Sequence, residues 1–407
     1  MSREFFAVRT VAEALDGFRP VRRTAAETVP AADAQGRVPA EAVRAPHDLP
    51  GFARSTVDGY AVRAADTYGA SEGLPGYLDV SGAVAMGAEP GVAVTPGAAV
   101  AVPTGAVLPP GADAVVMVEH TQEAMPGTIE VVRPVAPGEG LVRADEDAAT
   151  GAELVPAGRP LRAQDLGLLA AAGVTGVRVH ARPRIAIVST GDEVVPPETQ
   201  TLGPGQVRDA TAVALAALVR EAGGQPDIRG IVADHPDALE AVLVRAVAES
   251  DMVVVSAGSS VGARDETAAV VARLGEPGIW AHGLSLRPGK PTLLAEAGGV
   301  PVIGLPGNPR SALVVFRLVG MPVVRLIGGM TDPPPEPAVR ARLERDVPSA
   351  AGRLDVVQVA VRDGVARPLF GASALLSVLT AADGFIVVPD EATGLGAGTD
   401  VDVTLYR

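Results

Sequence analysis

The chain has 407 residues, which is more than one ordinary domain of about 100–200 residues holds, so we expect several domains. A formal net charge of −14 and an aromatic content of 3% make nucleic acid an unexpected partner, because it binds through positive charge and base stacking. The sequence has no cysteine, which excludes disulfides and thiolate metal sites, and its five scattered histidines lack the spacing of a zinc site.

The amino terminus, MSREFFAVRTVAEAL, does not have the basic start, long apolar centre and cleavage site of a secretory signal. No apolar run in the chain approaches the roughly 20 residues that cross a bilayer. We therefore expect a cytoplasmic protein that has no membrane partner.

Helical patterns at residues 8–15 and 159–179 flank a segment of different character, about 46–141, in which Gly and Pro separate short apolar runs. This composition is typical of strands and turns. We predict that residues 46–141 form a β-rich domain. It is inserted into a discontinuous linking or dimerisation domain formed by residues 1–45 and 142–182.

Short apolar runs alternate with longer helical patterns from about residue 184 to residue 330. This alternation predicts an α/β domain over 183–330, with a mostly parallel sheet covered by helices. The segment TDPPPEP at 331–337 ends it, because successive prolines continue neither a helix nor a central strand. Short strand patterns then predict a small β domain over 331–407. The expected fold class is thus a multidomain α/β plus β protein.

Polar, Gly-rich loops follow three predicted strands of the α/β domain: STGDEV at 189–194, SAGSSVGARD at 256–265 and GLPGNPRS at 304–311. Ligands bind at the carboxyl ends of parallel strands, where glycine allows close approach and helix N-termini favour anions. One such loop is more often an ordinary turn, but three at consecutive strand ends predict a phosphate-binding crevice. The residues expected there are Ser189, Thr190, Gly191, Gly258, Ser259, Ser260, Gly262, Pro306, Gly307, Asn308 and Pro309.

Carboxylates occupy the same loops, and a phosphate ligand beside them would require a bridging divalent cation. Mg²⁺ suits one or two carboxylates together with substrate oxygens, so Asp192, Glu193 and Asp265 are candidate metal ligands. Asp265 could instead cap a helix that begins there, and both roles could hold at once. Asp234, two residues before Pro236, has the same two interpretations with equal weight.

The segment LRPGKP places Arg287 and Lys290 on a turn stiffened by Pro288 and Pro291. Two cations on a stiff loop suit an oxyanion or a phosphate. The alternative is a solvated surface turn, and the neighbouring Gly-rich loops favour binding.

Two further turns lie in the β-rich segment, at Asp58 in STVDGYAV and at Thr104 in VPTGAV. Asp-Gly and Thr-Gly are ordinary hairpin signals. The residues alone therefore assign no function to Asp58 or Thr104.

Taken in order, the segments VDGYA, PTGAVLPPGADAVV, STGDE, SAGSSVGARD, RPGKP and GLPGNPRSA resemble the molybdopterin molybdenumtransferases, the MoeA and gephyrin E-domain family. The resemblance covers nearly the whole chain. It implies an elongated homodimer of four-domain subunits, in which the α/β domain of one subunit faces the β-rich domain of the other. It also implies a magnesium-dependent reaction that places molybdate on the dithiolene of adenylylated molybdopterin and releases AMP.

The same resemblance implies roles for individual residues. Positions needed for activity or metal binding would be Asp58, Thr104, Glu193, Asp234 and Asp265. A molybdate pocket would be formed by Arg287, Lys290, Pro291, Ser311, Arg353 and Ser373.

Four positions depart from the family pattern. Ala257 replaces a glycine of the second Gly-rich loop, Gly283 stands where a lysine is often found, and Arg287 replaces a lysine. Gln358 stands where many members have an arginine, for which Arg353 is a candidate substitute. An arginine offers a planar fork instead of a point charge, so the oxyanion geometry is expected to differ and tungstate stays open as an alternative metal source.

Two other functions remain open at this point. The α/β segment also resembles molybdopterin adenylyltransferases, which gives a rival activity and a candidate protein partner. A dimeric scaffold or sensor could bind the pterin without turning it over, because a fold and a pocket do not prove chemistry. Several carboxylates facing an anionic ligand argue against a mere binder.

Overall fold

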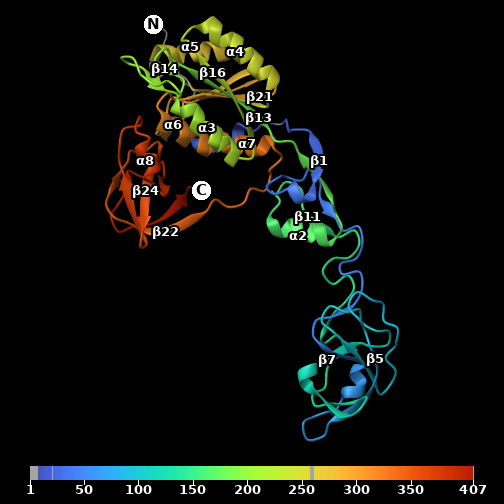
Figure 1. The fold of residues 1–407 in the computed structure, drawn as a ribbon. Helices are drawn as coiled ribbons and strands as arrows, with labels where there is room; N and C mark the ends of the chain where they lie inside the picture. Colours follow the sequence, from blue (N-terminus) through green and yellow to red (C-terminus); the bar gives the residue numbers. More distant parts are fainter. Residues whose placement is uncertain (1–7, 21, 257–260, 407) are drawn as a thin grey trace.

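The computed structural model describes residues 8–20, 22–256 and 261–406, with only the backbone of residues 261–265. The chain is elongated (Figure 1). An α/β domain lies at one end with the C-terminal β domain beside it, a linking domain lies in the middle, and the β-rich domain lies at the other end. The predicted fold class is confirmed.

The α/β domain is built on a six-stranded sheet in the order β16-β13-β17-β21-β20-β18. Its first four strands are parallel, and β20 runs antiparallel to both of its neighbours, β21 and β18. The strands are β13 (Arg184–Thr190), β16 (Gln225–Val232), β17 (Met252–Ser256), β18 (Pro277–His282), β20 (Leu293–Ala297) and β21 (Val300–Leu305). The central strands are near-continuous apolar runs because helices cover both faces of the sheet.

Helices form a core on each face of this sheet. They are α1 (Val11–Gly17), α3 (Ala210–Glu221), α4 (Pro236–Glu249), α5 (Val261–Val271), α6 (Pro309–Val315), the π-helical turn η4 (Phe316–Gly320) and α7 (Met321–Ile327). The opening helix α1 differs from the expectation for residues 1–45. Its Val11 and Ala14 join the α/β core together with Phe18, so α1 packs with the α/β domain instead of the linking domain.

Two helix starts correct the capping interpretations. Helix α4 begins at Pro236 with His235 as its N-cap residue, so Asp234 does not cap it. Helix α5 begins at Val261, which places Asp265 inside the helix and not at its N-cap. Asp234 is therefore available for other interactions.

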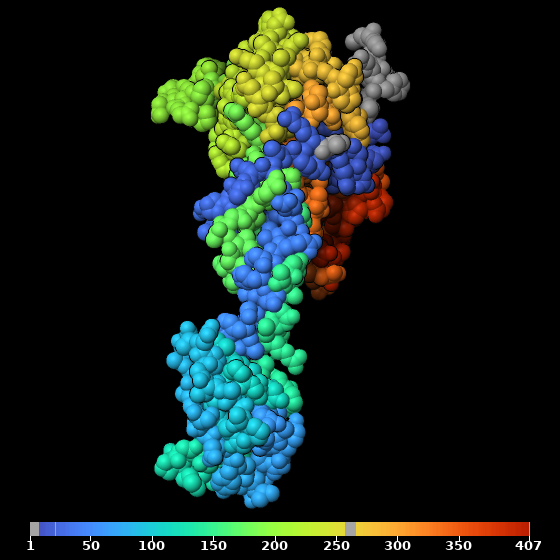
Figure 2. Space-filling view, turned by 90° about the vertical axis from the view of Figure 1, so that its right-hand side faces the viewer, coloured from blue at the N-terminus to red at the C-terminus, as the bar shows by residue number. Residues whose placement is uncertain are grey.

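The β-rich domain is a six-stranded sheet in the order β7-β4-β6-β5-β9-β8, as expected of residues 46–141. Its strands are β4 (Gly59–Val62), β5 (Gly76–Ala83), β6 (Ala98–Val102), β7 (Ala114–Met117), β8 (Thr121–Met125) and β9 (Thr128–Val131), with the short helices η2 (Ala64–Thr67) and η3 (Val118–His120). Two chain segments form the narrow connection to the linking domain (Figure 2), and they are held by the backbone hydrogen bond from Leu49 to Ala148 (2.7 Å).

The linking domain combines segments from both sides of this insertion. Its elements are β1 (Ala26–Pro30), η1 (Ala31–Asp33), β2 (Val43–Arg44), β11 (Glu153–Val155), α2 (Ala163–Ala171) and β12 (Gly176–His180). Strand β1 pairs with β12 and β2 with β11, both antiparallel. The helix expected over 159–179 is wrong in its second half, because the alternating segment GVRVH pairs with β1 as a strand.

The C-terminal domain is a small closed β-structure, since β24 pairs with both β25 and β26. Its strands are β22 (Ala338–Leu343), β24 (Leu354–Arg362), β25 (Val365–Leu369), β26 (Gly384–Val388) and β28 (Asp400–Leu405), with helix α8 (Ser377–Thr380). Strand β19 (Leu286–Arg287), from the α/β domain, adds to the edge of this sheet by pairing with β24. Shorter ladders are formed by β3 (Arg54–Ser55) with β10 (Leu141–Val142), β14 (Val194–Val195) with β15 (Val207–Arg208), and β23 (Val347–Pro348) with β27 (Gly394–Leu395).

Within the described ranges, none of the helices has both the length and the apolar character needed to span a bilayer.

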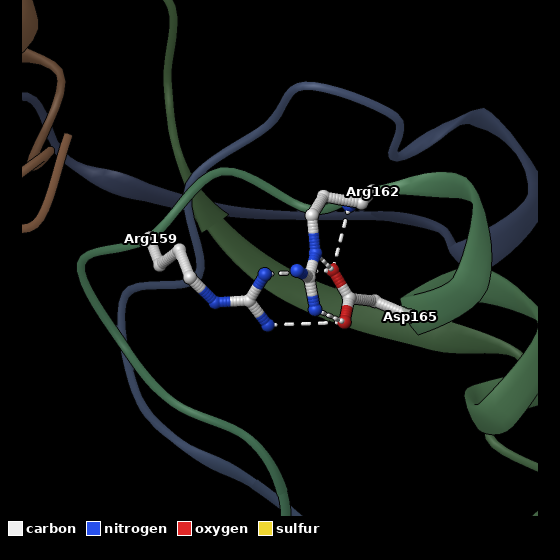
Figure 3. Close-up of polar contacts among 3 residues, drawn as sticks. All are labelled: Arg159, Arg162 and Asp165. Atoms are coloured by element: carbon white, nitrogen blue, oxygen red, sulfur yellow. Dashed lines mark hydrogen bonds and ion pairs between the residues drawn. The ribbon is translucent and has the colours of Figure 1, made fainter. Parts of the chain in front are cut away.

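A buried ion cluster fixes the start of α2 in the linking domain (Figure 3). Asp165, whose side chain is 7% exposed, accepts two hydrogen bonds of 3.0 Å from Arg159. It also accepts bonds from the backbone N–H of Arg162 (2.8 Å) and from its guanidinium. Burial opposes ionisation of Asp165, but the bonds from Arg162 and Arg159 outweigh it, so the pKa of this carboxyl lies well below its usual value.

We predict that Asp165→Asn destabilises α2 and β12 by about 3 kcal/mol at pH 7, because two guanidinium groups lose a buried partner. Because the pKa of Asp165 is lowered in the folded state, ionisation of this carboxyl stabilises the fold. The stabilisation is complete at pH values above the unfolded-state pKa and is lost as the pH falls through the folded-state pKa. The difference from wild type should thus shrink below about pH 4. Amide hydrogen exchange in α2 and β12 measures this. Asp402→Asn, which breaks an exposed pair with Arg340, is the control and should change little. If Asp165→Asn and Asp402→Asn changed amide exchange in α2 and β12 equally, the stabilising role of the buried ion cluster would be contradicted.

Candidate functional site

The three strands that precede the Gly-rich loops, β13, β17 and β21, end at one edge of the α/β sheet. Ser189 at the end of β13 is in register with Ser256 at the end of β17, which is in register with Leu305 at the end of β21. The buried hydroxyl of Thr190 donates to the carbonyl oxygen of Ser256 (3.4 Å). The loops that begin at Gly191 and Pro306 therefore start at the same edge of the sheet, with the end of β17 between them. Gly258, Ser259, Ser260 and Ala257 lie outside the described residues, and Gly262 is described only as backbone of α5.

Acidic residues cluster at the same edge. The backbone N–H of Asp234, just beyond β16, donates to the Asp192 carboxylate that follows β13 (3.1 Å). Partial burial and the negative charges of Asp192 and Glu193 raise the pKa of Asp234. Within the described ranges, no three Asp, Glu or His residues converge as a ready-made metal cage. The side chain of Asp265 lies outside the described residues.

The residues expected to bind molybdate line one cavity of about 740 Å³ between the α/β domain and the C-terminal domain. We call it the basic cavity. It includes Arg287, Lys290, Pro291, Ser311, Arg353 and Ser373, together with Pro306 and Asn308 of the third Gly-rich loop. The structure thus brings together residues that are up to 86 positions apart in the chain, from Arg287 to Ser373.

The turn that carries Arg287 and Lys290 is held in place by backbone hydrogen bonds and by packing against α6. Leu284 and Thr292 each donate a backbone hydrogen bond to the carbonyl oxygen of Lys290 (2.9 Å). Gly289 has a φ of +135°, and a Cβ on it would lie 2.5 Å from a methyl of Val315 in α6. Glycine is therefore required, and the turn lies directly against α6.

A buried carboxylate organises two of the cations. Asp355 of β24, 3% exposed, pairs with Arg353 (2.9 Å) and more loosely with Arg287 (3.5 Å). Lys290 is exposed. The described lining of the basic cavity contains four cationic side chains, the fourth being Arg310, and no acidic one. The cavity therefore has an excess of positive charge that suits an oxyanion.

Sequence reasoning missed Arg310, although it stands inside the GLPGNPRS loop. The Nε and Nη1 atoms of Arg310 are buried without a hydrogen-bond partner among the described residues. Burial and the nearby charge of Arg287 lower the pKa of this guanidinium. The signal available in the sequence was a cation directly before Ser311.

Two of the departures from the family pattern have a structural explanation. Gln358 is 2% exposed and accepts a hydrogen bond from the hydroxyl of Tyr406, whose pKa burial raises to about 12. Gln358 is absent from the described lining of the basic cavity, whereas Arg353 belongs to it. Gly283 is buried with a φ of +114°, and a Cβ on it would lie 3.2 Å from Val8. A lysine at 283 would be strained.

Asp58 and Thr104 form a separate pair in the β-rich domain. The backbone N–H of Thr104 donates to Oδ1 of Asp58 (2.7 Å), and its hydroxyl donates to the same oxygen (3.0 Å). These two bonds lower the pKa of Asp58, which keeps this exposed carboxyl ionised. Gly59 allows the arrangement, because a Cβ there would lie 1.9 Å from the carbonyl oxygen of Val116 on β7.

This pair does not join the other site residues within one chain. The β-rich domain lies at the opposite end of the molecule from the α/β domain (Figure 1). Intramolecular contact would require a large displacement across the linking domain. The single chain therefore presents two separated groups of candidate residues.

Comparisons with known proteins account for nearly the whole chain. Residues 9–173 match the family described as "MoeA N-terminal region (domain I and II)". Residues 186–326 match "Probable molybdopterin binding domain", and residues 340–406 match "MoeA C-terminal region (domain IV)".

Individual relatives agree with these matches. The protein called molybdopterin molybdenumtransferase 2 of Mycobacterium tuberculosis is 34% identical over 403 residues, which cover 97% of each chain. A molybdopterin molybdenumtransferase of Nostoc is 39% identical over 300 residues, 73% of this chain and 68% of the relative. A crystal structure of the molybdopterin biosynthesis moeA protein from Pyrococcus horikoshii has a TM-score of 0.86 and 30% identity, covering 98% of this chain and 100% of that one. The motif resemblance is confirmed, and the chain belongs to the MoeA family, the molybdopterin molybdenumtransferases.

Proposed function

We propose that this chain is a transferase of molybdenum cofactor biosynthesis that acts in the cytoplasm. It places molybdate on the dithiolene of adenylylated molybdopterin and releases AMP. The observation that carries the proposal is the basic cavity, which gathers the cationic turn, the third Gly-rich loop and the C-terminal domain around one space. Incubating the purified protein with molybdopterin adenylate, molybdate and Mg²⁺ and measuring AMP release tests it.

The basic cavity has the chemistry that a tetrahedral dianion requires. Lys290 presents an exposed ammonium group, and Arg353 is oriented by its bond to Asp355. Charge-assisted hydrogen bonds from such groups are the strong ones in proteins. Ser311, on α6, and Ser373 add hydroxyl groups to the same lining. We therefore assign molybdate to this cavity.

The neighbouring edge of the α/β sheet suits the nucleotide part of the substrate. The strand-end loops at 189–194 and 304–311 offer glycines and backbone N–H groups for phosphate oxygens. The basic cavity shares Pro306 and Asn308 with the second of these loops, so the two regions are continuous. The phosphates and the dithiolene of one substrate can then occupy them together.

Asp192, Glu193 and Asp234 fit a Mg²⁺ ion that also binds the substrate phosphates. Burial and, after it, the negative charges of Asp192 and Glu193 raise the pKa of Asp234, and a cation would offset those charges. Mg²⁺ normally takes one or two carboxylates and completes its shell with water and phosphate oxygens. When bound, the ion would neutralise charge that develops on the departing phosphate.

The second group of residues, Asp58 and Thr104, would reach this site from a second copy of the chain. We propose a two-fold homodimer in which the β-rich domain of one subunit covers the α/β edge of the other. The elongated shape supports the proposal, because it holds Asp58 far from the α/β domain of its own chain (Figure 1). The molybdopterin adenylyltransferase that makes the substrate is a further candidate partner.

The lysine of the basic turn provides a first prediction. Lys290→Ala should raise the molybdate concentration for half-maximal AMP release about ten- to a hundredfold, because a charge-assisted bond contributes roughly 1.5–3 kcal/mol. Affinity for the adenylylated pterin should change little. Arg287→Lys, which keeps the charge, should be milder. A weakened pterin affinity with unchanged molybdate dependence would place the nucleotide phosphates at this turn instead.

The shared site gives a second prediction. The homodimers of the Asp58→Asn variant and of the Lys290→Ala variant should each be nearly inactive at low molybdate. In each homodimer, both shared sites lack one required side chain. After unfolding and refolding as a mixture, half of the dimers carry one intact site, and about a quarter of wild-type activity should return. Light scattering checks that the mixture is dimeric. Activity that stays at the level of the single variants would contradict a site shared between subunits.

The acidic cluster gives a third prediction. Glu193→Gln and Asp192→Asn should each raise the Mg²⁺ concentration needed for AMP release by about tenfold, because each removes one charged oxygen ligand. Binding of the adenylylated pterin without Mg²⁺ should be unchanged or slightly stronger, since a negative charge near its phosphates is lost. Glu198→Gln, in an exposed segment of the same domain, is the matched control. An unaltered Mg²⁺ requirement in both variants would remove this metal site.

A further inference from the structure

Arg310 differs from the other two arginines of the basic cavity in having no ionic partner among the described residues. Arg287 and Arg353 share the Asp355 carboxylate. Arg310, at the second position of α6, lines the same cavity with its Nε and Nη1 atoms buried and without hydrogen bonds. A guanidinium holds five N–H groups, and leaving buried ones unsatisfied costs free energy. An anion in the cavity would provide the missing acceptors.

The position of Arg310 is fixed by contacts that do not use its side-chain nitrogens. Its backbone N–H donates to the carbonyl oxygen of Ser373 (3.2 Å). A Cβ on Gly371 would lie 3.7 Å from Nη1, so the 371–373 loop lies close beside the guanidinium. The guanidinium is therefore held between α6 and this loop without being neutralised.

The charges around Arg310 also point to an anionic ligand. Arg287 is near enough to lower its pKa. The Asp355 carboxylate is shared by Arg287 and Arg353, and the described lining contains no carboxylate that pairs with Arg310. Like charges held together in a partly buried cavity repel each other. Packing alone would be served better by an apolar side chain, so the arrangement is favourable only when an anion is bound.

We infer that Arg310 is an additional oxyanion-binding residue of the basic cavity, and that its guanidinium donates two hydrogen bonds to one tetrahedral dianion, molybdate in the proposed reaction. The inference rests on the proposed function for the identity of the anion. A planar guanidinium donates two parallel bonds to a pair of oxygens, which a lysine ammonium does not. Arg310 would thus fix the orientation of the dianion, while Lys290 supplies charge.

Direct binding of molybdate to the whole dimeric protein without pterin tests this inference, by equilibrium dialysis against molybdate at fixed ionic strength. Arg310→Met should weaken molybdate binding at least about tenfold, because two charge-assisted bonds are lost. Arg310→Lys should recover only part of the affinity. Arg340→Met removes the same charge from an exposed position of β22 and should bind molybdate as wild type does. Circular dichroism and thermal unfolding establish that every variant is folded.

Two results would overturn the inference. One is Arg310→Met binding molybdate with wild-type affinity. The other is Arg310→Met losing affinity for AMP or adenylylated pterin but not for molybdate, which would assign Arg310 to the substrate phosphates. Failure of the proposed function is a separate result, in which the wild-type protein binds no molybdate and releases no AMP. An active wild type with an unaffected Arg310→Met variant overturns only the role of Arg310.

Discussion

The carboxylate of Asp355 joins the two domains that form the basic cavity. It is 3% exposed, and it lies on β24 directly opposite Arg287 in the pairing of β19 with that strand. A buried charge is stable only when it is paired and hydrogen-bonded, so Asp355 requires Arg353 and Arg287. Those cations in turn need the α/β turn and the C-terminal domain to stay together. The binding cavity and the domain contact are therefore stabilised by the same ion pairs.

This dependence explains how an acidic protein can present an oxyanion site. The net charge of −14 repels anions from most of the surface. The described lining of the basic cavity contains four cations, and the one buried carboxylate beside it pairs with two of them, so the local field is reversed. A low local dielectric strengthens this field compared with the same charges in water. The proposed oxyanion site therefore has a local charge opposite in sign to the net charge of the chain.

Much of the fold could be predicted because its local signals agree with the tertiary structure. Segment 184–190 is a buried run of the length of a strand, and it is β13. The prediction failed where the partner strand determines the secondary structure of a segment. GVRVH at 176–180 continues a helical pattern, yet β1 offers it a complete antiparallel ladder. Asp234 likewise has a side chain of the kind that often caps helices. Helix α4 nevertheless has His235 as its N-cap residue, and the backbone N–H of Asp234 bonds to the Asp192 carboxylate.

The candidate site was predictable to a similar extent and for a similar reason. Arg287 and Lys290 stand on a recognisable stiff turn, and the family resemblance implies Ser311 and Ser373, which line the same cavity. Arg310 was missed, because an arginine at the start of a helix is usually a solvated surface residue.

Arg310 differs from such a solvated arginine because the 371–373 loop lies beside its guanidinium. Residues 371–373 come from a domain more than 60 positions later in the sequence, and no local pattern around position 310 indicates their approach.

The contribution of a charged side chain to ligand binding depends more on whether the side chain is buried than on which charged residue it is. An exposed arginine at position 310 would be hydrated and would add little to binding, since water would satisfy its N–H groups and screen its charge. Once the 371–373 loop lies beside it, water no longer reaches Nε and Nη1. The cost of that desolvation is present before any ligand arrives, so an anion that enters gains the full strength of the bonds. The C-terminal domain therefore contributes to binding by Ser373 and Arg353, and also by removing water from a cation of the α/β domain.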